Sequence, residues 1–192
     1  MRFRLPLTLP VLAFGIVTST AAAQETFVID PTHTTPMFEV THLGMSQQRG
    51  FFTNASGKIT LDRAARRGSI DIAIGTGSVV TASRVLTDVL KREDYFNAEK
   101  FPVMSFVSRD LVFDGDVPVV ANGELTLLGV TRPVALKITG FKCGTHPYNR
   151  RAMCGAEASA TIKRSEFGMT AGIPVAASDE VRIVIPVEAI RE

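Results

Sequence analysis

The sequence has no tryptophan, two cysteines and three histidines among 192 residues. A zinc site needs three or four converging ligands. Such ligands usually include closely spaced pairs such as His-x-His, and no such pair is present. The chain also lacks a Gly-x-Ser-x-Gly turn and a phosphate-binding loop with its lysine. We therefore expect no metal, no cofactor and no catalytic residues. A Ser-His-Asp triad is the exception, because its members can be far apart in the sequence and have no fixed spacing.

Long apolar runs are absent except near the N-terminus, where residues 5–17 follow two arginines. This run is shorter than the roughly 18 residues of a membrane-spanning helix, and small residues follow it. That combination is typical of a secretory signal peptide. We predict a signal peptide over residues 1–23, cleaved near Ala23/Gln24, and a single exported domain over residues 24–192.

An excess of charge of one sign is absent as well. Loss of Arg2 and Arg4 with the leader reduces the 21 basic residues to 19, equal to the 19 acidic residues. A neutral chain lacks the basic surface that nucleic-acid binding requires, and no basic run suggests attraction to anionic lipids. We expect no nucleic-acid partner.

The two cysteines, Cys143 and Cys154, lie close together in the sequence. In an exported protein such a pair predicts a disulfide that closes one loop, worth roughly 2–3 kcal/mol. Two reduced thiols are the alternative. A metal shared by the pair is less favoured, because His146 is the only histidine nearby.

Period-two alternation of apolar and polar residues dominates the rest of the chain and predicts half-buried antiparallel strands. Ile70, Ile72 and Ile74, for example, share one face of such a strand. Glycine, asparagine, aspartate and proline separate the strands, as is usual in turns. The alternating segments are residues 37–42, 57–62, 69–75, 101–113, 123–129, 133–140 and 181–190.

One segment, residues 83–91, has apolar residues at helical spacing instead. Thr81 or Ser83 can act as its N-cap, so we predict one short helix packed at an end of the sheet. Many strands with a single helix indicate an all-β protein, either a sandwich or a closed barrel. Periodicity alone does not choose between them.

Two of the histidines flank the strand predicted at residues 37–42. Because Glu39 belongs in water, His42 shares the opposite, inward face with Phe38 and Val40. Three roles remain open for His33 and His42: metal ligand, structural hydrogen-bonding group, or polar contact for the head group of a ligand.

Phenylalanine and methionine are abundant, with twelve and six residues. Several lie on inward faces or near strand ends. There they indicate either an ordinary packed core or the wall of a cavity for a flexible hydrocarbon. The residues concerned are Phe38, Phe51, Phe52, Met104, Phe106, Phe113, Phe167 and Met169.

A set of segments, in this order, matches one protein family. They are FVIDPTHTTPMFEVTHLGMSQQRGFF, GKITLD, DYFNAEKFPVMSFVS, GELTLLGVTRPVALKI, IKRSEFGM and a last strand ending in VEAI. Each is weak alone, but together they extend over essentially all of the mature sequence. The chain therefore resembles the YceI-like proteins, exported polyisoprenoid-binding proteins of bacteria.

This resemblance implies an extended antiparallel, lipocalin-like β-barrel of about eight strands in a periplasmic carrier or storage protein. Its apolar tunnel would hold a polyisoprenoid, such as an isoprenoid quinone, or another long-chain lipid. The expected ligand-binding residues are the phenylalanines and methionines given above with Val40. His33, His42 and Arg164 are the expected polar contacts for the head group.

At one place the chain departs from the family pattern. Members often carry Arg-Asp-x-His-Leu where this chain has Leu86, Thr87, Asp88, Val89 and Leu90, so only the leucine matches. If the helix covers the tunnel mouth, the missing arginine and histidine would alter which head group is accepted.

Two rival functions are a lipid-modifying enzyme that uses the same cavity and a stress-related interaction protein without a fixed ligand. Edge strands near the termini suggest a homodimer. Loading and release of a lipid would require a transient contact with a membrane or with a lipid enzyme.

Overall fold

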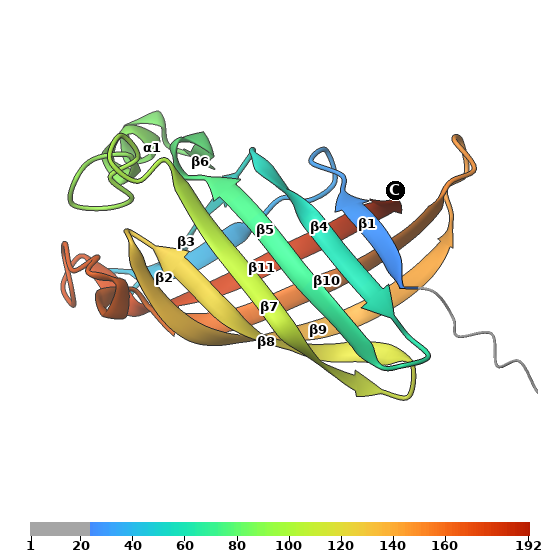
Figure 1. The fold of residues 1–192 in the computed structure, drawn as a ribbon. Coiled ribbons are helices and arrows are strands. Elements are labelled where there is room, and N and C mark those ends of the chain that lie inside the picture. Colours follow the sequence, from blue (N-terminus) through green and yellow to red (C-terminus); the bar gives the residue numbers. More distant parts are fainter. Residues whose placement is uncertain (1–23) are drawn as a thin grey trace, which may run out of the picture.

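The fold was determined from a computed structural model that describes residues 24–192, so the predicted signal peptide lies outside the described part. Most of this part is β-strand, rolled into a barrel with one α-helix at one end (Figure 1). No helix among the described residues is long and apolar enough to cross a membrane.

The elements in chain order are β1 (Glu25–Ile29), β2 (Met37–His42), β3 (Ser46–Phe52), β4 (Ala55–Asp62), β5 (Arg67–Gly75), the short 3-10 helix η1 (Thr76–Ser78), β6 (Val79–Thr81), α1 (Arg84–Leu90), β7 (Val103–Asp114), β8 (Val117–Leu127), β9 (Val130–Thr145), β10 (Ala152–Lys163), η2 (Arg164–Phe167) and β11 (Ala177–Arg191). All seven strands predicted from alternation are present. β1, β3, β6 and β10 were not predicted.

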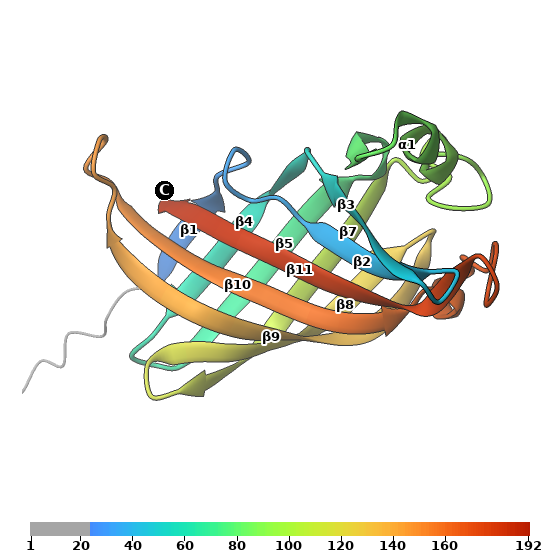
Figure 2. The same cartoon turned by 180° about the vertical axis from the view of Figure 1, so that it is seen from behind.

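Closure of the barrel depends on β11. The strands follow one another in the order β1, β4, β5, β7, β8, β9, β10 and β11, each antiparallel to its neighbour, and β11 pairs back to β1. β11 is long enough to pair with two strands on one edge, with β1 near its end and with β2 from Ala177 to Val184. β2, β3 and β6 thereby extend the wall at one end (Figure 2). The eight-stranded barrel is confirmed, and the sandwich alternative is wrong.

The alternation read from the sequence matches the two faces of the barrel wall. Ile74 of β5 is buried inside, and Ile70 and Ile72 pack against the same core. On β7, Met104 and Phe106 are buried on the same inner side. Inward apolar residues on every side therefore surround one common interior.

The single α-helix lies at one end of the barrel in both views (Figures 1 and 2). It begins at Ser83, whose hydroxyl accepts a hydrogen bond from the backbone N–H of Leu86 (3.3 Å), as expected for an N-cap. Within the helix, Leu90 is buried, whereas Val85 faces solvent. The predicted helix is confirmed in position and in its cap.

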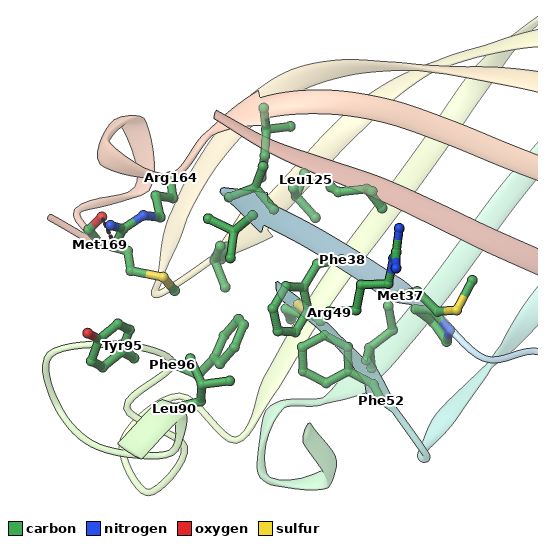
Figure 3. Close-up of a pocket in the computed structure, with 18 of the residues that line it drawn as sticks. Met37, Phe38, Arg49, Phe52, Leu90, Tyr95, Phe96, Leu125, Arg164 and Met169 are labelled. Atoms are coloured by element: carbon green, nitrogen blue, oxygen red, sulfur yellow. Dashed lines mark hydrogen bonds between the residues drawn. The ribbon is translucent and has the colours of Figure 1, made fainter. Parts of the chain in front are cut away.

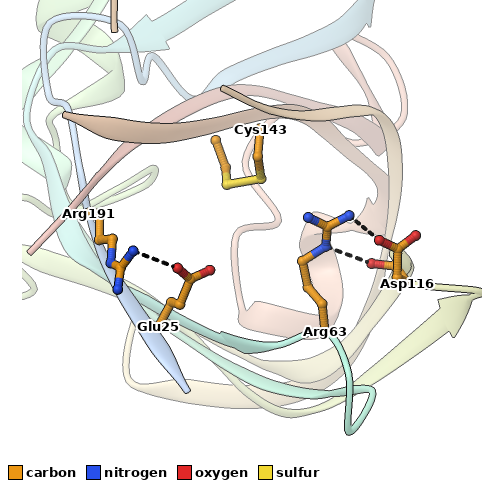
Figure 4. The surroundings of a disulfide bond; sticks show 6 residues. Glu25, Arg63, Asp116, Cys143 and Arg191 are labelled. Carbon is orange, nitrogen blue, oxygen red and sulfur yellow. Dashed lines mark hydrogen bonds and ion pairs between the residues drawn. A yellow bond between two sulfur atoms is a disulfide. The ribbon is translucent and has the colours of Figure 1, made fainter. Parts of the chain in front are cut away.

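The β9–β10 hairpin lies at the opposite end of the barrel and is closed by a disulfide. Cys143 and Cys154 face each other directly in the register of the two strands and are bonded. Around the same end, Arg63 pairs with Asp116, and Arg191 pairs with Glu25 at 2.9 Å (Figure 4). The predicted disulfide is confirmed, and it fixes this end covalently.

Replacement of both cysteines by serine is expected to lower the free energy of unfolding by about 2–3 kcal/mol, because the bridge restricts the unfolded chain. Chemical denaturation measures this change. Amide hydrogen exchange should rise in residues 141–156 and stay unchanged in α1, which lies at the other end. Unaltered stability, or equal acceleration at both ends, would contradict this assignment.

Candidate binding cavity

An apolar cavity of about 250 Å³ lies inside the barrel at the end that carries α1 (Figure 3). Its wall is built from the inward faces of the strands, for example Ile74 of β5, Leu125 of β8 and Ile183 of β11. Leu86 and Leu90 of α1 complete the wall. The helix therefore contributes to the cavity as well as to the fold.

Several side chains that line the cavity are only half-buried. Ile162, Ile183 and Ile185 point into the barrel and line the cavity, yet each retains accessible surface. Residues of a close-packed core would be fully enclosed by their neighbours. The accessible surface of these isoleucines is the surface of an open space, so the barrel is hollow here.

Two glycines keep large rings out of that space. Gly50 lies opposite Phe38 in the β2–β3 register, and a methyl group on Gly50 would come 2.4 Å from the Phe38 ring. Gly123 pairs with Ser108 in the β7–β8 register, two residues from Phe106, and a methyl group on it would come 2.5 Å from the Phe106 ring. Because glycine has no side chain, both rings lie over the neighbouring strand. The rings line the cavity rather than block it.

A cluster of aromatic rings joins the barrel wall to the segment that follows α1. The Phe38 ring lies 6.1 Å from the rings of both Phe52 and Phe96, and Phe52 and Phe96 are 5.2 Å apart in an edge-to-face arrangement. Such pairs stabilise beyond the burial of their area. They hold the segment after α1 against the cavity.

A second apolar cavity, of about 70 Å³, lies toward the disulfide end. Its wall includes Phe27 of β1, Phe141 of β9 and Cys154 of the disulfide. Leu136 of β9 lines both cavities. The interior therefore holds two compartments in series, with Leu136 between them.

Arg164 is the buried cation of the large cavity, with only 4% of its surface exposed. Its guanidinium donates to the backbone carbonyls of Ser178 (3.0 Å), Met169 (3.3 Å), Ala171 (2.8 Å) and Ala177 (3.4 Å). Burial lowers the pKa of Arg164. The side chain thus holds the segment between η2 and β11 against the barrel.

His42 lies at the end of β2 and lines the same cavity as Phe38 and Val40, as the alternation predicted. Glu39 lines neither cavity and pairs with Arg49 (2.6 Å) and with Arg182. These two hydrogen-bonded cations, Arg49 first, lower the Glu39 pKa. His42 is exposed to solvent as well as lining the cavity, because it ends the strand.

His33 lies outside the cavity, in the turn between β1 and β2. Its Nδ1 is 2.8 Å from a carboxylate oxygen of Asp30 and 3.9 Å from one of Glu188. These three side chains form the one cluster of metal-ligating types that the structure brings together within residues 24–192. The hydrogen bond with Asp30 raises the His33 pKa, which favours a proton on this nitrogen over a metal ion.

The sequence of the chain matches the family model of the YceI-like domain over residues 27–189. The chain belongs to the YceI-like family. It is 33% identical over 190 residues to UPF0312 protein PA0423 of Pseudomonas aeruginosa, covering 96% of this chain and 98% of that protein. It is 32% identical to Protein YceI of Salmonella paratyphi B, with 94% and 95% coverage.

Three solved structures share the barrel fold. Burkholderia cenocepacia BcnA has a TM-score of 0.71 at 22% identity and covers 83% of this chain and 98% of its own. The Campylobacter jejuni YceI protein has a TM-score of 0.65 at 28% identity, with 79% and 90% coverage. A polyisoprenoid binding domain from Saccharophagus degradans has a TM-score of 0.63 at 17% identity, with 86% and 98% coverage.

Eight of the twelve residues predicted for ligand binding in this YceI-like chain line the large cavity. His33, Phe51, Phe113 and Phe167 do not. Phe51 lies on the outer face of β3, Phe167 is enclosed in η2 with 1% exposure, and Phe113 is half-buried near the other end of β7. The eight that line it are Phe38, Val40, His42, Phe52, Met104, Phe106, Arg164 and Met169.

Sequence reasoning missed Leu136, Tyr95 and Phe96 as residues of the cavity. Tyr95 and Phe96 form an aromatic pair directly after the predicted helix, which is a signal that the sequence did contain. Leu136 lies in the alternating segment 133–140, on the face that carries its apolar residues. Its position between two compartments depends on the barrel as a whole, so no local pattern reveals it.

The contact between Asp30 and His33 should stabilise the β1–β2 turn within a limited pH range. Hydrogen bonds from Thr32 first, and then His33, lower the Asp30 pKa from 3.8 to about 2, so its contribution is present above pH 3.8 and lost as pH falls toward 2. The His33 pKa is raised from 6.5, so its contribution is present below pH 6.5 and lost as pH rises through the raised value.

The substitution Asp30→Asn is expected to lower the His33 pKa toward 6.5, because the amide removes the negative charge yet can still accept hydrogen bonds from Thr32. NMR titration of the imidazole resonances measures the midpoint. The resonances of His146, which accepts hydrogen bonds within the β9–β10 turn, serve as the internal control. A His33 midpoint that does not move would show that Asp30 is not the cause.

Proposed function

We propose that this protein binds a polyisoprenoid, or another long-chain amphiphilic lipid, in the large cavity and carries or stores it in the periplasm. The observation that carries the proposal is a hollow interior whose wall is almost entirely apolar. The similarity in fold to a polyisoprenoid binding domain from Saccharophagus degradans supports it.

The driving force is removal of the hydrocarbon tail from water, worth about 25 cal/mol for each Å² of apolar surface. A preformed cavity adds to this driving force. Wall residues such as Ile183 and Leu125 lack packing partners on one side, so a bound tail gives them new van der Waals contacts. Ordering a flexible tail offsets part of the gain, so buried area does not translate directly into affinity. Shape and dryness then select linear apolar chains.

We propose the eight cavity-lining residues of the expected set as the ligand contacts. To them we add Tyr95, Phe96 and Leu136, which line the same space. His33 is not included, because its ion pair with Asp30 holds the turn outside the barrel. Phe51, Phe113 and Phe167 are left out because they line neither cavity.

Binding without chemistry is supported by the residues of the wall. A lipid-modifying enzyme that forms a covalent intermediate would need a nucleophile such as serine, cysteine or a carboxylate in contact with the lipid. The wall of the large cavity within residues 24–192 contains no carboxylate, serine or cysteine, and its titratable groups are His42, Arg49, Tyr95 and Arg164. A binding protein needs no more than this set.

A periplasmic location is supported by two features. The Cys143–Cys154 disulfide suits an oxidising compartment, and the N-terminal sequence has the pattern of an export signal. A carrier there would keep a water-insoluble lipid dispersed between two membranes.

The substitution Ile162→Trp is expected to abolish or strongly weaken lipid binding, since the indole would occupy the cavity. Its neighbour Thr161 is exposed on the outer face of β10, so Thr161→Trp is the matched control and should bind normally. Each variant adds one indole to a tryptophan-free protein, so its fluorescence also reports whether the ring is buried. Protein purified from its own compartment should give one extracted lipid per wild-type chain by native mass spectrometry.

Absence of lipid from the wild-type protein, together with no uptake of added polyprenols, would refute the proposed function. Equal lipid content in the two tryptophan variants would show that lipid binds outside the cavity.

The substitution Leu136→Ala is expected to join the two compartments and to raise affinity for geranylgeraniol relative to the shorter farnesol. Leu127→Ala is the control, because Leu127 is equally buried and lines the large cavity alone. Each variant should lose about 2–5 kcal/mol of stability from the cavity it creates. A gain in preference for the longer tail in both variants, or in neither, would refute a dividing role for Leu136.

A further inference from the structure

Two neighbouring loops at the α1 end of the barrel lack charge and expose apolar side chains. They are the β2–β3 turn and the loop between η2 and β11, which lie side by side in Figure 2. Residues 40–48 and 167–178 contain no aspartate, glutamate, lysine or arginine, although 21% of the chain is charged. Met45 is 87% exposed, Val175 77% and Leu43 50%. We call four exposed residues of these loops the apolar tips: Leu43, Met45, Pro174 and Val175.

Backbone hydrogen bonds hold the two loops together. The N–H of Leu43 donates to the carbonyl of Ala176 (3.1 Å), and His42 pairs in register with Ala177. Within the second loop, the N–H of Ala176 donates to the carbonyl of Gly172 (2.7 Å). The apolar tips therefore form one surface whose backbone is already ordered.

This surface borders the large cavity. His42 directly precedes Leu43, and Ala176 directly follows Val175, and both His42 and Ala176 line the cavity. His42 is also exposed to solvent. The lining of the cavity thus continues along the chain into the apolar tips, with no charged residue between them.

Leu43 is an unfavourable residue for its own turn. The N–H of Met45 donates to the carbonyl of His42 (2.9 Å), so Leu43 and Gly44 are the central residues of the turn, with φ values of 53° and 68°. Positive φ suits glycine and asparagine, whereas it strains a leucine. Neither the turn nor burial accounts for a leucine here, which favours a role outside the fold.

A lipid bilayer fits the apolar tips better than another protein does. Contiguous exposed apolar residues mark sites of contact with proteins or membranes. Four side chains of this size cannot cover the roughly 800 Å² per partner that a stable protein–protein interface buries. Insertion into a bilayer makes no such demand, because lipid surrounds each inserted side chain. The lack of charge favours a zwitterionic bilayer, since no charge has to leave water.

We propose that the apolar tips insert into the surface of a zwitterionic phospholipid bilayer and hold the cavity against it for loading and release of lipid. The inference rests on the proposed function and names the surface from which the lipid reaches the cavity. A hydrocarbon tail that moves from the bilayer past the tips stays in apolar surroundings. It thereby avoids the cost of exposing its surface to water.

Flotation with phosphatidylcholine vesicles measures bilayer binding, and transfer of geranylgeraniol from the same vesicles measures loading. The wild-type protein should bind equally well at low and high salt. The double variant Met45→Ser/Val175→Ser should bind about tenfold or more weakly, because it removes two apolar side chains, and should load more slowly. Its uptake of geranylgeraniol added in ethanol without vesicles should be unchanged, since neither residue lines the cavity.

Two single variants serve as controls. Tyr148→Ser should bind vesicles normally, because Tyr148 is equally exposed, at 91%, but lies in the β9–β10 turn at the opposite end. Leu43→Asn separates a membrane role from a structural one. It should leave the protein at least as stable in chemical denaturation, since asparagine adopts positive φ more readily, and yet weaken vesicle binding.

Uptake of geranylgeraniol from ethanol without vesicle binding by the wild-type protein would overturn the inference and leave the proposed function intact. Failure of uptake by both routes would overturn the two together. Binding that requires phosphatidylglycerol and is lost at high salt, or that Tyr148→Ser weakens, would place the contact elsewhere and refute the inference. A wild-type dimer that dissociates in Met45→Ser/Val175→Ser, without vesicle binding, would make a second copy the partner and also refute it.

Discussion

Closure of one antiparallel sheet on itself is the constraint on which the rest of the structure depends. A barrel of eight strands leaves an interior just wide enough for its own side chains or for one slender ligand. In this protein the side chains that point inward decide whether the interior is filled or hollow. Gly50 and Gly123 let the rings of Phe38 and Phe106 lie against the wall, and aliphatic residues of moderate size cover the remainder. The interior stays open, apolar and narrow.

The two ends of this barrel are closed by different means. The β9–β10 hairpin is fixed by a covalent bond, while the other end is closed by α1 and by contacts among Phe38, Phe52 and Phe96. The buried cation, Arg164, lies at the non-covalent end. An amphiphile bound with its polar group at Arg164 would direct its tail toward Leu136 and the disulfide. The asymmetry of the ends thus gives the cavity a direction.

The sequence predicted the strands that show strict alternation and failed where alternation is weak. β10 contains mostly small residues, and β3 begins with polar ones, so neither has a clear apolar face. Alternation along a strand also explains which of the predicted residues reach the cavity. Phe51 and Phe52 are adjacent, so they face opposite sides of β3, and only Phe52 reaches the cavity. Arg164 was chosen for its charge, while its burial and its carbonyl partners could be learned only from the fold.

The central claim is that lipid occupies the apolar interior of the barrel. A crystal structure of the protein purified from its own compartment tests it most directly. We expect continuous, elongated electron density that begins beside Arg164 and runs between the Phe38 and Phe106 rings toward Leu136. An interior that contains ordered water, or is filled by rearranged side chains, while lipid is found only on the outer surface, would contradict the account.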